Sequence, residues 1–162
     1  MKRHESLHPL SQHHHFALIE ALEIRRAHQL PATRRRAELR RLAAKFVRFW
    51  EAKGRIHFRE EEEMLLPAYA RHVPLEQDAD VVRMLADHAF IRAMIEDLRR
   101  ALAAEQPVED ALVILGQRLK EHVRLEEDKI FPRIEQALAE EEMRALGRHL
   151  TRLHRKGEIC ET

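Results

Sequence analysis

The chain contains 162 residues, of which 29 are basic and 28 are acidic, so its net charge is close to zero. This balance provides no overall attraction to nucleic acid or to an anionic membrane surface, and no apolar run approaches the roughly 20 residues of a membrane-spanning helix. The composition is rich in Ala, Leu, Glu and Arg and has only four glycines. It favours an all-helical protein with one sizeable core.

Prolines and the spacing of apolar residues divide the chain into four main helices. These predicted helices run from about Leu10 to Gln29, from Thr33 or Arg34 to about Arg71, from Pro74 to about Glu105, and onward from Pro107. Each carries one apolar stripe, which is typical of a helix that buries one face. Because the linkers are short, we predict an up-down-up-down antiparallel four-helix bundle over residues 10–139.

The two ends of the chain lie outside this predicted bundle. We expect a flexible segment over residues 1–9, a short additional helix over residues 140–155 packed on the outside, and a tail over residues 156–162. The one cysteine, Cys160, has no partner for an intrachain disulfide, and the N-terminal residues lack an apolar signal segment. We therefore expect a cytoplasmic protein.

One sequence motif occurs twice, in the second and fourth predicted helices. Residues 57–67 read HFREEEEMLLP and residues 122–132 read HVRLEEDKIFP. In each copy a histidine and a glutamate are four residues apart, which places both on one face of a helix. A single pair of this kind is common, but two copies followed by the same glutamate and proline predict a duplicated metal half-site. Each proline is expected either to kink its helix or to end it.

The apolar stripes carry one histidine of each helix toward the core. Of the three consecutive histidines in the first helix, His14 aligns with His88 when Phe16 is superposed on Phe90, and His15 is the rival choice. Two buried carboxylates beside four imidazoles require a cation, because burying an unpartnered charge costs several kcal/mol. The predicted ligands are His14, His57, Glu61, His88, His122 and Glu126, with His13 and His15 as possible additional ligands.

The ligand types limit the choice of metal. Imidazole and carboxylate without thiolate suit iron, manganese, zinc or copper, and six side chains exceed the needs of one tetrahedral zinc ion. If both glutamates bridge, they favour two octahedral ions with positions left for solvent or a small ligand. No catalytic residue is assigned.

These residues resemble the hemerythrin-like proteins, also called HHE cation-binding domains. The resemblance covers about residues 7–140 and rests on Leu-Ser-Gln-His-His-His at 10–15, both copies of the His-x-x-x-Glu-Glu motif, Asp87-His88 with Ile91-Arg92, and Phe131-Pro132. It implies a helical bundle holding two non-haem irons, bridged by oxo or hydroxo and by the carboxylates of Glu61 and Glu126. Oxygen carriers of the family have a further histidine where this chain has Arg92. One ion is then a histidine short unless His13 or His15 fills the gap, and a vacant position would admit water, peroxide or nitric oxide.

The resemblance implies a protein that binds dioxygen, nitric oxide or peroxide in oxygen or redox binding or sensing. The alternatives are an enzyme that consumes peroxide or nitric oxide, an iron store or donor, and a bundle with structural zinc. No nucleic acid or membrane is expected as a partner, and no protein partner is identified from the sequence.

Several other polar residues lie close to the motif. We expect Glu62 and Glu127 either to lie directly behind the ligands or to be solvated, and Glu60 and Glu63 to be surface charges. The remaining histidines are expected at the surface: His4, His8, His28, His72, His149 and His154.

Overall fold

The computed structural model describes residues 3–159, and the side chains of residues 3–151. The helices are α1 (His8–His28), α2 (Ala32–Phe49), α3 (Arg55–Glu60), α4 (Leu66–Tyr69), α5 (Ala79–Ala103), α6 (Glu109–Leu125), α7 (Phe131–Ala137) and α8 (Glu140–Ile159), with the 3-10 turns η1 (Glu5–Leu7) and η4 (Leu75–Gln77) and the π-helical segments η2 (Trp50–Gly54), η3 (Glu61–Leu65) and η5 (Glu126–Ile130). No strand occurs in this part of the chain, which confirms the predicted all-helical class. Cys160 and the side chain of His154 lie outside the described residues.

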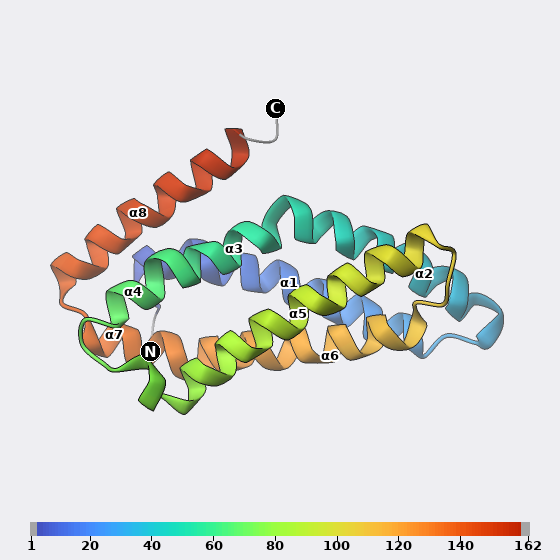
Figure 1. Ribbon diagram of the computed structural model, residues 1–162, viewed down its shortest axis with the longest axis horizontal. Coiled ribbons are helices and arrows are strands. Elements are labelled where there is room, and N and C mark those ends of the chain that lie inside the picture. The colour runs from blue at the N-terminus through green and yellow to red at the C-terminus, as the bar shows by residue number, and fades with distance from the viewer. Residues whose placement is uncertain (1–2, 160–162) are drawn as a thin grey trace.

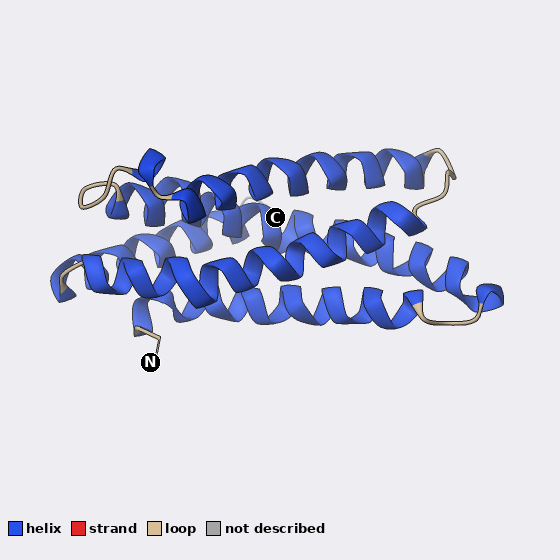
Figure 2. Cartoon of the chain, turned by 90° about the horizontal axis from the view of Figure 1, so that it is seen from below, coloured by secondary structure: helices blue, strands red, loops and turns tan. Residues whose placement is uncertain are grey.

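The helices lie side by side, and the chain runs back and forth along the long axis of the molecule (Figures 1 and 2). The segments α2, η2, α3, η3 and α4 follow one another without a loop over residues 32–69, and α6, η5 and α7 do the same over residues 109–137. Helix α1 packs against α2 and α6, and α5 packs against the same two helices. No helix within the described residues is both long enough and apolar enough to cross a bilayer.

The core consists of two apolar blocks with a polar layer between them. One block contains Phe46, Ile91 and Leu115, and the other contains Leu10, Met84 and Phe131. Helices α1 and α5 and the continuous segments 32–69 and 109–137 each pass from one block to the other, and the predicted ligands occupy the stretch in between. This arrangement removes the polar layer from water on both sides, so its charges must be neutralised locally.

The two motif prolines do not end their helices. Each lies just after a π-helical segment, in which the backbone N–H of Leu66 donates to the carbonyl of Glu61 and that of Phe131 donates to the carbonyl of Glu126. The wider turn allows the helix to continue past a proline, which has no N–H to donate. Both π segments begin at the inner glutamate of the motif, so the two halves of the fold are locally equivalent.

The ends of the chain differ from the expectation. Residues 5–9, expected to be flexible, form η1 and the start of α1, and Leu7 is fully buried. Helix α8 extends to Ile159, beyond the predicted boundary at 155. Its apolar residues Met143, Leu146 and Leu150 are buried, and it packs against η1, α3 and η3. The apolar face of α8 therefore covers both the N-terminal turn and the motif-bearing helix.

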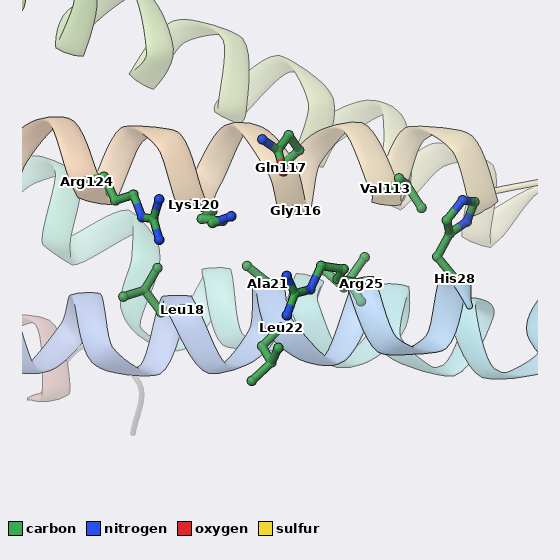
Figure 3. Close-up of a pocket in the computed structure, with 11 residues that line it drawn as sticks. Leu18, Ala21, Leu22, Arg25, His28, Val113, Gly116, Gln117, Lys120 and Arg124 are labelled. Carbon is green, nitrogen blue, oxygen red and sulfur yellow. The ribbon is translucent and has the colours of Figure 1, made fainter. Parts of the chain in front are cut away.

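A cavity of about 280 Å³ lies between α1 and α6 (Figure 3). Apolar residues of both helices line it together with Arg25, Lys120 and Arg124. It contains none of the predicted ligands, so it is separate from the polar layer.

Candidate metal centre

The structure brings the six predicted ligands together in the polar layer. His14 comes from α1, His57 from α3, His88 from α5 and His122 from α6, while Glu61 and Glu126 are the first residues of η3 and η5. Their exposed fractions are between 0 and 6 %. His15 is exposed and takes no part, whereas the neighbouring His14 is 2 % exposed and lies among the other ligands.

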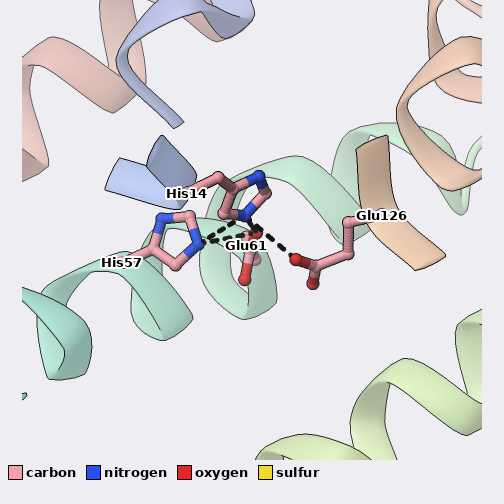
Figure 4. Close-up of side chains that lie close together, drawn as sticks. All are labelled: His14, His57, Glu61 and Glu126. Carbon is pink, nitrogen blue, oxygen red and sulfur yellow. Dashed lines mark hydrogen bonds and ion pairs between the residues drawn. The ribbon is translucent and has the colours of Figure 1, made fainter. Parts of the chain in front are cut away.

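Four of these residues form one group, the His14 cluster, which consists of His14, His57, Glu61 and Glu126. The Nε2 atoms of its two histidines are 2.9 Å apart. His57 Nε2 is 3.2 Å from Glu61 Oε1, and His14 Nε2 is 3.0 Å from Glu126 Oε2. The four side chains point toward a common centre (Figure 4).

A second group, the His88 cluster, consists of His88, His122 and the same two glutamates. His88 Nε2 lies 3.3 Å from Glu61 Oε2, and His122 Nε2 lies 3.1 Å from Glu126 Oε1. Each glutamate therefore presents one oxygen to each cluster, and each cluster has its own pair of histidines.

The separations between ligand atoms fit the size of a bound metal ion. For metal–ligand bonds of about 2.1 Å, neighbouring ligands are about 3.0 Å apart in an octahedral site and about 3.4 Å apart in a tetrahedral site. The close contacts between ligand atoms of the two clusters are 2.9 to 3.6 Å, and all ligand atoms of each cluster lie within 4.8 Å of one another. Each cluster can therefore close around an ion with only small movements of its side chains.

Protonated histidines balance the charges of the two buried glutamates. Burial opposes ionisation of Glu61, but the charge of His57 and hydrogen bonds from the surrounding histidines hold its pKa well below the usual value. Burial likewise opposes the charged form of His88, yet hydrogen bonds to Glu126, Glu61 and Glu62 raise its pKa to about 11. Burial opposes the charged form of His14 too, but hydrogen bonds to Glu126, Glu127 and Glu61 raise its pKa well above the usual value.

A second carboxylate supports one histidine in each cluster. Glu62 Oε1 accepts a hydrogen bond from His88 Nδ1 at 2.7 Å, and Glu127 Oε1 accepts one from His14 Nδ1 at 2.6 Å. A carboxylate on Nδ1 fixes the tautomer and turns Nε2 toward the metal site. Each copy of the motif thus supplies its own histidine, an inner glutamate, and an outer glutamate that orients a histidine of another helix.

Arginines hold both outer carboxylates. Arg92 donates to the two oxygens of Glu62 at 2.8 and 2.9 Å, and Arg3 donates to Glu127 at 2.8 Å. Although burial opposes ionisation, hydrogen bonds from the histidine and the arginine lower the pKa of Glu62 to about 2, and a similar set lowers that of Glu127 to about 2. Arg92, which stands where oxygen carriers have a histidine, therefore binds Glu62 and not the centre.

A further carboxylate, Asp87, lies behind His122. It is 2 % exposed, accepts from Arg83 at 3.1 Å and from Arg118 at 2.9 Å, and has Oδ2 4.0 Å from His122 Nδ1. Asp87 was not among the site residues predicted from the sequence. Its position directly before the predicted ligand His88 was the one sequence feature that pointed to it.

The prediction that Glu60 is a surface charge is wrong. Glu60 is 1 % exposed, and its Oε2 lies 3.7 Å from Nδ1 of His13, which is also buried. Burial, with the charge of Glu61 adding to it, raises the pKa of Glu60 to about 8. The cause is tertiary, because the side chain of Glu60 lies against His13 of α1, which is distant in the sequence. Glu63 is exposed as expected and pairs with Arg59.

An apolar cavity adjoins the His14 cluster. It has a volume of about 20 Å³ and is lined by His13, His14, Ala17, Phe46, Phe49, Trp50, Lys53, Gly54, His57, Phe58, Leu119, His122 and Val123. This volume suits about one water-sized molecule. A Cβ atom at Gly54 would lie 2.5 Å from the Trp50 ring, so the glycine allows the indole to fold back against the helix beside the cavity.

Comparison with known proteins agrees with the resemblance seen in the sequence. The family model described as the hemerythrin HHE cation-binding domain matches residues 7–134. No curated protein and no solved structure matches the chain. Because the matched range includes all six predicted ligands and covers most of the sequence, the chain belongs to the hemerythrin HHE cation-binding family.

Proposed function

We propose that the His14 and His88 clusters hold two non-haem iron ions bridged by Glu61 and Glu126, within an up-down-up-down bundle of the hemerythrin type. One observation carries this proposal: each of the two buried glutamates directs one oxygen to each pair of histidines. A mononuclear site would leave one histidine pair unused and one carboxylate oxygen per glutamate without a role. The absence of thiolate among the donors suits iron.

The centre has room for a small ligand. Counting both glutamates as bridging, the protein supplies about eight of the twelve bonds that two octahedral ions need. Arg92 is engaged by Glu62 and His15 is exposed, so neither of them completes the set. The adjoining cavity admits about one small molecule. When bound, a pair of redox-active ions would supply the electrons for reversible binding of dioxygen and open coordination positions for nitric oxide or peroxide.

The residues of the chain prepare the site for this role. The outer carboxylates keep the Nε2 atoms of His88 and His14 turned inward. Phe58 stacks on His88 with ring centroids 3.7 Å apart, and Phe131 stacks on His14 at 5.3 Å. These aromatic rings exclude water from the edges of the centre. A small neutral ligand therefore competes with fewer water molecules for the open coordination positions. We accordingly propose binding or sensing of a small ligand as the function.

A second candidate function is consumption of peroxide or nitric oxide at the same centre. The observation in its favour is that Arg92 leaves the His88 cluster with two histidines. Steady-state turnover separates the two functions, since a carrier or sensor binds its ligand without consuming it.

The first test is elemental analysis of protein purified without an affinity tag and without added metal. We expect about two iron ions per chain, and ultraviolet–visible spectra that change when dioxygen, nitric oxide or peroxide is added. One ion per chain would refute the paired centre. Two zinc ions would refute the redox role and leave a structural bundle.

A further inference from the structure

A third group of side chains that could bind a metal ion lies beside the His14 cluster, and two of its three members take no part in the paired centre. His13, His57 and Glu60 bring their ligand atoms within 4.8 Å of one another. His13 Nδ1 is 3.7 Å from Glu60 Oε2, and the rings of His13 and His57 meet edge to face at 5.4 Å. Two histidines and one carboxylate form a common ligand set for iron(II), which leaves the other coordination positions open.

This third group is looser than the two clusters. His13 Nδ1 and Glu60 Oε2 are 3.7 Å apart, whereas the histidine and glutamate atoms that meet most closely in the His14 and His88 clusters are 3.0 to 3.3 Å apart. Binding an ion here requires the three side chains to move closer to one another. This movement costs free energy that binding to the preformed clusters does not require. The third group should therefore bind an ion more weakly, as a temporary site would.

Its position lies on the outer side of the centre. His13 is 9 % exposed and His57 is 6 % exposed, while His14, His88, His122 and the two inner glutamates are 0 to 2 % exposed. The cavity of about 20 Å³ also touches His13, His57 and His14. An ion that comes from solvent on this side therefore meets His13 and His57 before the more deeply buried residues of the paired centre.

We propose that His13, Glu60 and His57 form a transit site through which divalent metal ions reach the paired centre. His57 belongs to both the third group and the His14 cluster, so it links the two. The ion exchanges its bonds to His13 and Glu60 for bonds to His14, Glu61 and Glu126, and no electron is transferred. This role rests on the proposed paired centre.

Metal uptake and release in protein variants test the proposal. Metal-free protein is mixed anaerobically with iron(II), or with cobalt(II) as a coloured probe, in a stopped-flow instrument, and release into excess chelator is followed separately. The variants are His13→Gln and Glu60→Gln, with His15→Gln as the matched control because His15 is the exposed neighbour of His14. Circular dichroism of each metal-free variant verifies its fold.

We expect uptake and release to slow by the same factor, at least about tenfold, which is the scale on which loss of a metal-site partner acts. The final number of ions per chain and the equilibrium affinity should stay unchanged, since a transit site changes only rates. His15→Gln should behave as wild type. If only one of the two variants folds, its uptake and release rates are still sufficient to test the transit role.

Unchanged rates in His13→Gln and Glu60→Gln, with two ions bound by wild type, would refute the transit role alone. Loss of an ion at saturation in either variant would also refute it, because the residue would then hold a resident ion. Fewer than two ions in wild type would refute the paired centre and the transit role together.

Discussion

Changing Glu62 to Gln removes one negative charge from behind His88 while keeping the size of the side chain. The carboxylate accepts from His88 Nδ1 at 2.7 Å and from Arg92 at 2.8 and 2.9 Å. A neutral amide is a weaker acceptor, and its NH2 group cannot accept the Nδ1 hydrogen. The variant should therefore hold His88 less firmly in the orientation that turns Nε2 toward the centre.

The size of the effect follows from the strength of the lost interaction. A hydrogen bond to a charged group contributes about 1.5 to 3 kcal/mol and one between neutral groups about 0.5 to 1.5 kcal/mol. The side chain of Glu62 is 28 % exposed, so solvent screening reduces the difference to about 1 kcal/mol. Since about 1.4 kcal/mol corresponds to a factor of ten, we expect the affinity of one metal ion to fall by roughly fivefold, just below the range for such partners.

Competition between the protein and a chromophoric chelator measures the two metal affinities. Glu127→Gln should weaken the other ion in the same way, because Glu127 supports His14 at 2.6 Å. Glu63→Gln is the control, since Glu63 is exposed and pairs only with Arg59 among the described residues. Wild-type affinities for both ions in Glu62→Gln and Glu127→Gln, or an equal loss in Glu63→Gln, would refute this reasoning.

Three more predictions concern the inner glutamates, pH and packing. Glu126→Ala should lower the metal content from two ions to less than one per chain, because Glu126 faces both clusters; two retained ions would show that it does not bridge. In the metal-free protein the pKa of His88 is raised from 6.5 to about 11. The stability that its protonation contributes is therefore complete below pH 6.5 and lost as pH rises through about 11. Urea unfolding should show a fall over this window that His88→Gln flattens, and equal slopes would contradict the assignment. Gly54→Ala should displace the Trp50 ring, which lies 2.5 Å from the added Cβ atom, and lower stability by about 1 to 3 kcal/mol; an unchanged thermal midpoint would show that the ring moves freely.

Much of the fold follows from the sequence because helical periodicity is a local property. Apolar residues recur every three or four positions, and the same rule places His57 with Glu61, and His122 with Glu126, on buried faces. The repeated motif also indicated a duplicated arrangement, and the two π segments that start at these glutamates show the same duplication in the backbone. The family resemblance drawn from these residues is confirmed by the family match over residues 7–134.

Other features depend on how the helices meet. The choice between His14 and His15 is one of direction, since consecutive residues of a helix point about 100° apart and only the neighbouring helices define which direction is inside. The partners of the outer glutamates lie on other helices, so that Glu62 meets His88 and Glu127 meets His14. No spacing within one helix predicts such a pairing.

The sequence by itself therefore determined the helical class, the duplicated motif and five of the six inward residues, all but the one from the first helix, because each of these depends on spacing along one helix. Only the tertiary structure decided that each inner glutamate faces two histidine pairs, that Arg92 binds Glu62, and that α8 packs against α3 where Glu60 is buried. These features arise from contacts between segments distant in the chain, whose relative positions are set by packing of the whole core.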